Sequence, residues 1–415
     1  MFYSGAVKPF VMPAVAHRLS YGLALFLAVA VSISYLPFLT DLQVMGMSVA
    51  GLWHKLLLGV FALLALLSLW EEQPLVTDVV KLGGLLIICL LLEWLVLSAF
   101  STANDFGGEI RMMLIPLCAL WVGFRMRMDE KRLKVLFCFF ALGILGVGLT
   151  VVFGQGSGFR IVEQYFSEQK NAIGPILATA AVLCMSLAVN ANGRKTFLQV
   201  LLGLALSGLC VLLILTIRAR AALLAVALVL LLMLFQRFKG SYLLLSLWLA
   251  LLLGAAVFFL LPDSLKDYVH RSLFSGFSGG DISSGRMARN DQAIRVWVQN
   301  PLLGHLVNPE EVAVVHNYPL WKLYKYGLIG ALPMLLAYVV LLVADVKTVL
   351  EAGRGTLMSA GAYAVLVLYV VSMFEYTFPF GPGTATVMNF FLMGVALRAR
   401  NSKEKNLFYL KNENQ

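Results

Sequence analysis

The stretch "VVHNYPLWKLYKYGLIGALPMLLAYVVLLV", residues 314–343, passes from a polar segment into a mostly apolar run. From Leu320 onward the run is long enough to cross the hydrocarbon core of a bilayer, which takes roughly 20 predominantly apolar residues. His316 and Asn317 stand just before it, and Pro319 suits the first turn of a helix, where a backbone N–H has no partner to lose. The stretch therefore predicts a membrane-spanning helix with a histidine at its entrance.

The whole chain repeats this apolar character. Of its 415 residues 60% are hydrophobic and only 13% are charged, and the mean hydropathy is +0.86. Such a composition is typical of an integral membrane protein. We expect an all-α integral membrane protein with about twelve transmembrane helices. Their approximate cores are residues 19–36, 54–70, 82–100, 112–124, 133–153, 172–189, 197–217, 221–235, 243–261, 320–343, 357–374 and 384–397.

These runs predict four parts of the chain. Residues 1–261 hold nine spans with short loops, 262–320 form one long loop containing short helices, 321–398 hold three more spans, and 399–415 form a tail. The first run is long for a signal peptide, so we expect an uncleaved helix. Most of the 32 Lys and Arg residues fall in alternate loops, which predicts that both termini are cytoplasmic and that the long loop is periplasmic. This orientation accounts for most of the net charge of +10, which therefore does not indicate nucleic-acid binding.

Cysteine and histidine give no indication of a metal site. The five cysteines all fall inside predicted spans, and neither they nor the five histidines have the spacing of metal ligands. Buried cysteines of this kind usually serve as packing residues. We expect no metal, no cofactor and no structural disulfide.

Basic residues on the outer side oppose the preferred orientation, so each is a candidate for function. In "TIRARAALLA", residues 216–225, Arg218 and Arg220 occupy a very short link between two spans. Arginines near helix ends often reach up to lipid headgroups. Alternatively, their planar guanidinium groups form a fixed site for phosphate oxygens.

The segment "SSGRMARNDQAIRVWVQNPLLG", residues 283–304, predicts a short helix capped by one of its serines and ended by Pro301. Arg286 and Arg289 would lie about 60° apart on one helix face, with Arg295 on the opposite face. The two arginines either bind an anion or form part of a solvated face.

A third basic segment is "FRIVEQYFSEQKN", residues 159–171, which we expect to be a loop after the fifth span. It carries Arg160 and Lys170. Glu163 and Glu168 could pair with these cations at little energetic consequence, so this segment is the weakest of the three candidates.

His316 adds a candidate base to the outer cations. An ordinary histidine has a pKa near 6.5 and can accept a proton near neutral pH, although many interfacial histidines have only a structural role. Arginines together with a base suggest a lipid-linked polyanion with a leaving group, such as a polyprenyl diphosphate sugar. The arginines would neutralise the departing diphosphate, and His316 would deprotonate the attacking hydroxyl.

The order of the three segments that hold residues 216–225, 283–304 and 314–330 resembles the O-antigen ligase and polymerase superfamily of membrane glycosyltransferases. The shared pattern is an arginine-bearing outer hairpin, a long loop with S-G-R, W and N-P-L-x-G, and H-N before the next helix. The resemblance covers roughly residues 155–330 and implies a GT-C-type fold, inversion at the anomeric carbon, and no use of a metal or nucleotide sugar.

The resemblance also implies residue roles. His316 would be catalytic, with Asn317 and Lys170 in supporting positions. The donor diphosphate would be bound by arginines from three segments, with one or both members of each pair involved: Arg160, Arg218 or Arg220, and Arg286 or Arg289.

Among members of this superfamily, a chain with about twelve spans and a short basic tail is most similar to the O-antigen ligases. The implied reaction transfers O-polysaccharide from undecaprenyl diphosphate to lipid A-core at the periplasmic face of the bacterial inner membrane. An O-antigen polymerase would use the same donor with another lipid-linked glycan as acceptor, and a protein O-oligosaccharyltransferase is a third possibility. A lipid-linked glycan flippase or transporter, in contrast, should have cations deep within its spans and repeated halves.

Overall fold

The protein is described by a computed structural model. It describes residues 12–34, 36, 43–44, 47–69, 77–100, 103–154, 160–190, 196–237, 266, 285–306, 315–351, 357–381 and 386–412. At some helix ends, among them residues 160–170, it describes the backbone but not the side chains. The expected ninth span, residues 243–261, lies outside these ranges.

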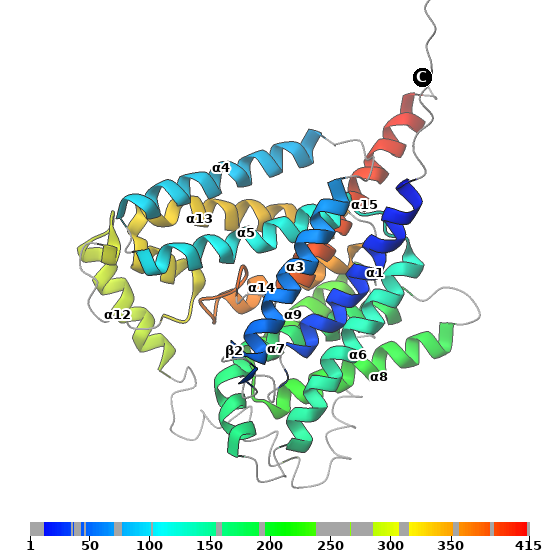
Figure 1. Ribbon diagram of the computed structural model, residues 1–415, viewed down its shortest axis with the longest axis horizontal. Coiled ribbons are helices and arrows are strands. Elements are labelled where there is room, and N and C mark those ends of the chain that lie inside the picture. Colours follow the sequence, from blue (N-terminus) through cyan, green and yellow to red (C-terminus); the bar gives the residue numbers. More distant parts are fainter. Residues whose placement is uncertain are drawn as a thin grey trace, which may run out of the picture.

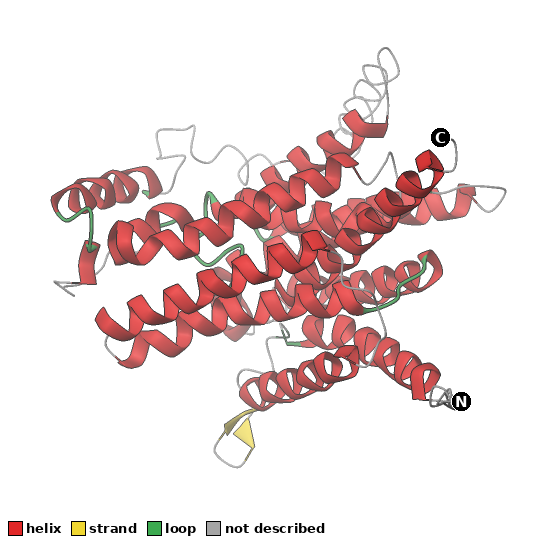
Figure 2. Cartoon of the chain, turned by 90° about the horizontal axis from the view of Figure 1, so that it is seen from above, coloured by secondary structure: helices red, strands yellow, loops and turns green. Residues whose placement is uncertain are grey.

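The described chain is helical apart from one hairpin of two very short strands (Figures 1 and 2). Its elements are α1 (Met12–Ile33), β1 (Gln43–Val44), β2 (Met47–Ser48), α3 (Val49–Leu69), α4 (Thr77–Phe100), α5 (Ala103–Arg125), α6 (Glu130–Gly154), α7 (Arg160–Val189), α8 (Thr196–Thr216), α9 (Arg220–Arg237), α12 (Arg286–Gln299), η1 (Gly304–Leu306), α13 (Tyr318–Glu351), η2 (Leu357–Ser359), α14 (Ala360–Ser372) and α15 (Val387–Asn412).

Five of the helices contain segments long and apolar enough to cross a membrane: Val80–Ala99, Glu130–Thr150, Asn171–Val189, Phe197–Thr216 and Tyr318–Glu351. Several shorter apolar helices accompany them. Large apolar side chains also cover outward surfaces; on α4, Ile87, Leu91 and Leu95 are exposed at a spacing of four residues. A water-soluble protein rarely exposes such a stripe, so the helices indicate a protein embedded in a membrane.

Close packing joins the C-terminal helix to the bundle. α15 packs along α5 and α14. A Cβ atom on Gly123 of α5 would collide with the backbone of Phe391, and one on Gly394 of α15 would collide with the backbone of Leu120. Small residues at such contacts allow helix backbones to approach closely. In a membrane, where lipid is as apolar as the helix surfaces, this close packing stabilises helix pairs.

Two differences from the sequence-based expectations concern helix limits. α5 begins at Ala103 and continues through Pro116, so the fourth helix is longer than the expected core of residues 112–124. Arg160 and Lys170 lie in the first turns of α7 rather than in a loop. Their segment is rich in residues that form helices well, and the backbone hydrogen bonds of α7 extend through it.

The basic residues expected in the cytoplasm gather at one end of the bundle. Arg398 donates to the backbone oxygen of Arg125 at 3.0 Å, and Arg400 pairs with Glu351 at 2.8 Å. Arg132, near the start of α6, contacts His17 near the start of α1. α13 is interrupted at Gly327, and its unbroken part from there to Glu351 is about 35 Å long at 1.5 Å per residue. In Figure 1, α12 and the beginning of α13 accordingly lie opposite the end where α15 finishes.

A backbone interlock joins the end of α12 to α13. Gly327 interrupts α13 with φ 61° and ψ −172°, which a glycine adopts without the strain of a side chain. The interruption leaves two amides without helical partners, and they donate to the chain after α12: Leu328 N to Pro301 O at 2.8 Å and Ile329 N to Leu302 O at 3.0 Å. Gly304 lies against Gly327 so closely that a Cβ on either residue would collide with backbone atoms.

We predict that Gly327→Ala undocks α12 from α13. The new Cβ would collide with Leu302. The alanine would also have to adopt a φ that costs a residue with a side chain about 1–3 kcal/mol. Hydrogen exchange of the α12 amides, measured in lipid nanodiscs, should become faster, while the amides of α15 should be unchanged. The matched control is Gly208→Ala, since a Cβ at Gly208 has no neighbour within 4 Å. Equal protection of α12 in the two variants would contradict the interlock.

Candidate active site

Arg286 and Arg289, which the sequence predicts to share one helix face, lie in the first turn of α12. The helix runs from Arg286 to Gln299, before Pro301, as predicted. Its N-cap is Gly285, at φ 78° and without a side-chain cap, rather than one of the preceding serines. A left-handed conformation suits glycine better than serine. The first turn thereby directs Arg286 and Arg289 toward the start of α13.

A small apolar cluster holds α12 on α13. Ala293 of α12, Val315 and Tyr324 are buried together. Val315 directly precedes His316, so the cluster fixes the backbone position of the histidine. Apolar burial contributes about 25 cal/mol per Å², and here it acts together with the glycine interlock described above.

Asn317 joins the start of α13 to the end of α14. Its side-chain oxygen accepts a hydrogen bond from Leu320 N at 2.9 Å, which makes it the N-cap of α13. Its side-chain amide donates to Met373 O at 3.3 Å. One side chain thus joins two helix ends beside His316, and the supporting role of Asn317 stays a prediction.

Arg286 crosses from α12 to the same end of α14. Its Nη1 donates to Phe374 O at 2.9 Å, and its Nη2 donates to Glu375 Oε1 at 2.7 Å. The last carbonyl groups of a helix lack partners within the helix and carry partial negative charge. A guanidinium at this position therefore satisfies the end of α14 and also neutralises the Glu375 carboxylate, which is buried.

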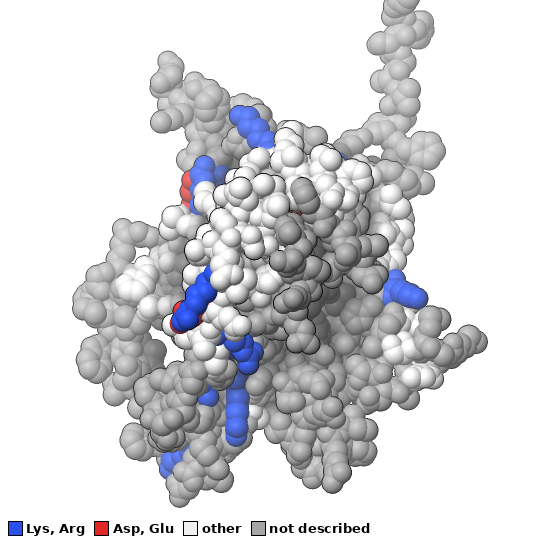
Figure 3. Space-filling model, turned by 90° about the vertical axis from the view of Figure 1, so that its left-hand side faces the viewer, with Lys and Arg blue, Asp and Glu red and all other residues white. Residues whose placement is uncertain are grey.

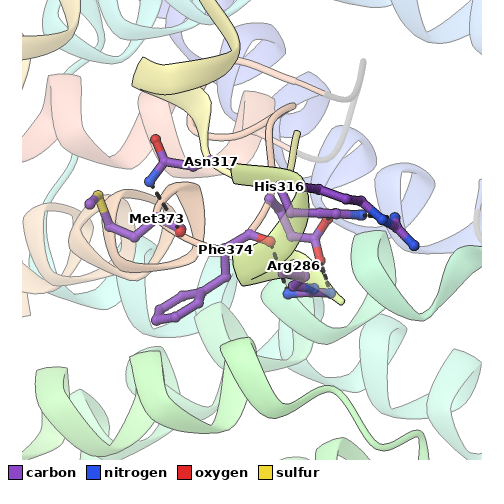
Figure 4. A network of polar contacts seen from close by, with 7 residues as sticks. Arg286, His316, Asn317, Met373 and Phe374 are labelled. Atoms are coloured by element: carbon purple, nitrogen blue, oxygen red, sulfur yellow. Dashed lines mark hydrogen bonds and ion pairs between the residues drawn. The ribbon is translucent and has the colours of Figure 1, made fainter. Parts of the chain in front are cut away.

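His316 stands between a carboxylate and a guanidinium group (Figure 4). Its Nδ1 lies 3.5 Å from Glu375 Oε2. Its Nε2 lies 3.2 Å from Arg289 Nη1. The Tyr376 ring lies edge-on, with the ring centroids 6.5 Å apart. Two of the predicted diphosphate-binding arginines, Arg286 and Arg289, therefore converge with the predicted base at one place.

The environment of His316 favours the neutral imidazole. Burial, followed by the positive charges of Arg286 and Arg289, lowers the pKa of His316 from 6.5 to about 4. The sequence-based expectation of an ordinary pKa is therefore wrong for this resting arrangement, because the neighbouring guanidinium groups could not be placed from the sequence. At neutral pH the ring is uncharged, and Arg289 faces its Nε2.

Arg218, in the link between α8 and α9, and Arg220, the first residue of α9, lie at the same end of the bundle as His316. The Tyr363 hydroxyl, near the start of α14, bonds to Gln236 near the end of α9. The two helices thus run in opposite directions, and the start of α9 lies beside the end of α14, from which Glu375 follows. Arg218 has a φ of 58°, as a tight hairpin requires. It is Arg289, however, that contacts His316 directly, and Arg286 is joined to the histidine through Glu375.

The roles proposed for Arg160 and Lys170 stay predictions. Both residues belong to the helical backbone of α7, but their side chains lie outside the described residues. Among the residues that are described, no group of three or more His, Cys, Asp and Glu side chains could hold a metal ion.

Glu375 is the residue of this site that the motifs missed. It bridges Arg286 and His316, yet it lies 59 residues beyond the histidine and outside the region of resemblance. One signal for it exists in the sequence, because an acid within a predominantly apolar region is a functional candidate by default. On the face of the molecule that includes α12, Lys and Arg atoms occur at several places and acidic atoms at few (Figure 3).

Comparisons with known proteins do not assign the chain to a family. No protein-family model matches the chain, and no curated protein matches it either. The class defined by fold and site is therefore an all-helical, membrane-embedded protein with two arginines, a histidine and a buried glutamate gathered at one end.

We predict that the imidazole of His316 titrates near pH 4 in the resting protein, and that Arg289→Gln moves this pKa upward by removing a positive charge. The measurement is an NMR titration of histidine-labelled protein in nanodiscs, with Arg295→Gln as a control on the opposite face of α12. An unfolded chain binds this proton near pH 6.5. The folded protein should therefore lose stability as the pH falls from about 6.5 to about 4. A midpoint near 6.5 in the unaltered protein would contradict this assignment.

Proposed function

We propose that this protein is a metal-independent, inverting membrane glycosyltransferase of the O-antigen ligase type. It would transfer O-polysaccharide from undecaprenyl diphosphate to lipid A-core. The observation that supports the proposal most directly is the convergence of Arg286, Arg289 and His316. All three come from the motifs that resemble the superfamily. Arg286 and Arg289 lie 27 or more residues before His316 in the sequence, so their meeting depends on how the helices pack.

The site suits displacement of a diphosphate. His316 Nε2 would take the proton of the acceptor hydroxyl while the hydroxyl oxygen forms a bond to the anomeric carbon. The bond from that carbon to the diphosphate oxygen breaks, and its electron pair leaves with the diphosphate. Guanidinium groups would neutralise the negative charge that develops there. Diphosphate is a good leaving group, so no second acid is required.

Donor binding would also activate the base. In the resting arrangement Arg289 donates to Nε2, where the acceptor hydroxyl must bind. A diphosphate offers Arg289 stronger, charged acceptors, so the guanidinium would move to the phosphate oxygens and release Nε2. The same negative charge would offset the two arginines that lower the pKa of His316. The imidazole would then become a stronger base only when the donor is bound.

The cellular placement belongs to the same proposal. Because the pairs that involve Arg125, Arg398 and Arg400 lie at the end opposite His316, the preference of Lys and Arg for the cytoplasm supports a site on the periplasmic face of the inner membrane. Both termini would then be cytoplasmic. The arginine-histidine site lies at one end of α13 rather than at its middle, which favours a transferase over a transporter with a binding site at the bilayer midplane.

The choice between ligase and polymerase depends on the acceptor. Purified protein would be incubated with a lipid-linked glycan donor and, in separate reactions, with lipid A-core or a second lipid-linked glycan. A ligase extends lipid A-core. Extension of the lipid-linked glycan alone would identify a polymerase instead.

We predict that His316→Ala lowers glycan transfer by about 10²- to 10⁴-fold, the usual contribution of a general base. Donor binding should persist, because the arginines remain. Transfer can be followed by gel mobility of the glycosylated acceptor, and donor binding by native mass spectrometry. Transfer at the unaltered rate would remove His316 from the mechanism.

We predict that the double substitution of Arg286 and Arg289 by alanine weakens donor binding at least tenfold, since charged hydrogen bonds contribute about 1.5–3 kcal/mol each. Arg295→Ala, on the same helix, should bind the donor normally. Hydrogen exchange of α12 would establish that the helix stays docked. A docked double variant with unchanged donor affinity would count against the arginine clamp.

A further inference from the structure

Glu375 occupies a position that determines which nitrogen of His316 can act. Its two carboxylate oxygens have different partners: Oε1 accepts from Arg286 at 2.7 Å and Oε2 faces His316 Nδ1 at 3.5 Å. We propose that Glu375 is a positioning residue that holds His316 in the Nδ1–H tautomer and so leaves Nε2 as the base. This inference rests on the proposed glycosyl transfer.

The partners of the ring define the tautomer from both sides. Arg289 faces Nε2, and a guanidinium has only donors, so Nε2 must present its lone pair. Glu375 faces Nδ1, and an ionised carboxylate has only acceptors, so Nδ1 must carry the proton. The lone pair thus lies on the side of the ring from which the diphosphate would draw Arg289 away.

The position of Glu375 is itself fixed by the end of α14. Its backbone N–H donates to Val371 O at 2.9 Å, and the preceding carbonyl groups of Met373 and Phe374 are held by Asn317 and Arg286. The carboxylate is buried, so water cannot easily replace it as the acceptor. A fixed, buried acceptor aligns an imidazole better than a mobile one.

The charge of Glu375 has a second use once the reaction starts. When Nε2 takes the acceptor proton, the ring becomes an imidazolium next to two arginines. Among the described residues, the charged and titratable groups around it are Arg286 and Arg289 from α12, and Glu375 and Tyr376 after α14. Only Glu375 among these is ordinarily negative at neutral pH, so it would stabilise the imidazolium.

The carboxylate can be tested with its closest neutral analogue. Glu375→Gln keeps the size of the side chain but replaces one acceptor with an NH₂ donor. If the amide oxygen of the new side chain accepts from Arg286, its NH₂ group faces His316 Nδ1. This arrangement favours the Nε2–H tautomer. Glu375→Asp keeps two acceptor oxygens on a shorter side chain and should retain the Nδ1–H tautomer.

The first experiment is ¹⁵N NMR of histidine-labelled protein in nanodiscs without substrate, above pH 6. The chain has five histidines, and the His316 signal is the one absent from His316→Gln. We expect a protonated Nδ1 and an unprotonated Nε2 in the unaltered protein and in Glu375→Asp. Glu375→Gln should shift the population toward Nε2–H. An Nε2–H ring in the unaltered protein, or the same tautomer in the Gln variant, would overturn the inference.

The second experiment measures transfer. Glu375→Gln should lower kcat by on the order of 10- to 100-fold, with a smaller change in the KM for the donor, and Glu375→Asp should recover part of kcat. If the unaltered protein transfers no glycan, the proposed function fails while the tautomer result still stands. If the unaltered protein is active and Glu375→Gln has the same kcat, the positioning role fails and the proposed function survives.

Discussion

The contact between Gly304 and Gly327 determines whether the candidate site exists. Gly327 interrupts α13, and the amides released by the interruption bind the carbonyl groups that follow α12. Neither glycine has room for a Cβ, so the chain after α12 approaches α13 this closely because both residues are glycine. Arg286 and Arg289 lie at the far end of the same short helix. Their position beside His316 therefore follows from a backbone contact that contains no functional side chain.

The end of α14 is the second fixed point of the site. Its terminal carbonyl groups need donors, and Asn317 and Arg286 supply them from two other parts of the chain. Both donors belong to segments with proposed functional roles, so the hydrogen bonds that complete the helix also assemble the site. This arrangement explains why Glu375, in the turn after α14, meets His316 although no motif connects them.

The sequence allowed the helical membrane architecture and the common face of Arg286 and Arg289 to be predicted from local periodicity, and the end of α12 from Pro301, whereas the expected serine cap was wrong because Gly285 caps the helix. The meeting of this face with His316 was a hypothesis that the structure bears out in its geometry. Glu375 could not be predicted as a partner, since its contact depends on how α12, α13 and α14 pack. The lowered pKa of His316 escaped prediction for the same reason. The loop expected around Arg160 was wrong because weak amphipathic periodicity does not mark where α7 begins.

The charges at the two ends of the bundle meet different physical demands. Cations such as Arg400, at the end expected in the cytoplasm, agree with the preferred orientation of a membrane protein. Arg286 opposes this preference if the site faces the periplasm, and its partial burial beside a helix end would add a desolvation penalty. The Glu375 carboxylate offsets both costs by pairing with Arg286 at 2.7 Å. The same carboxylate then remains next to His316, so the pairing that stabilises a cation on this side of the membrane also orients the base.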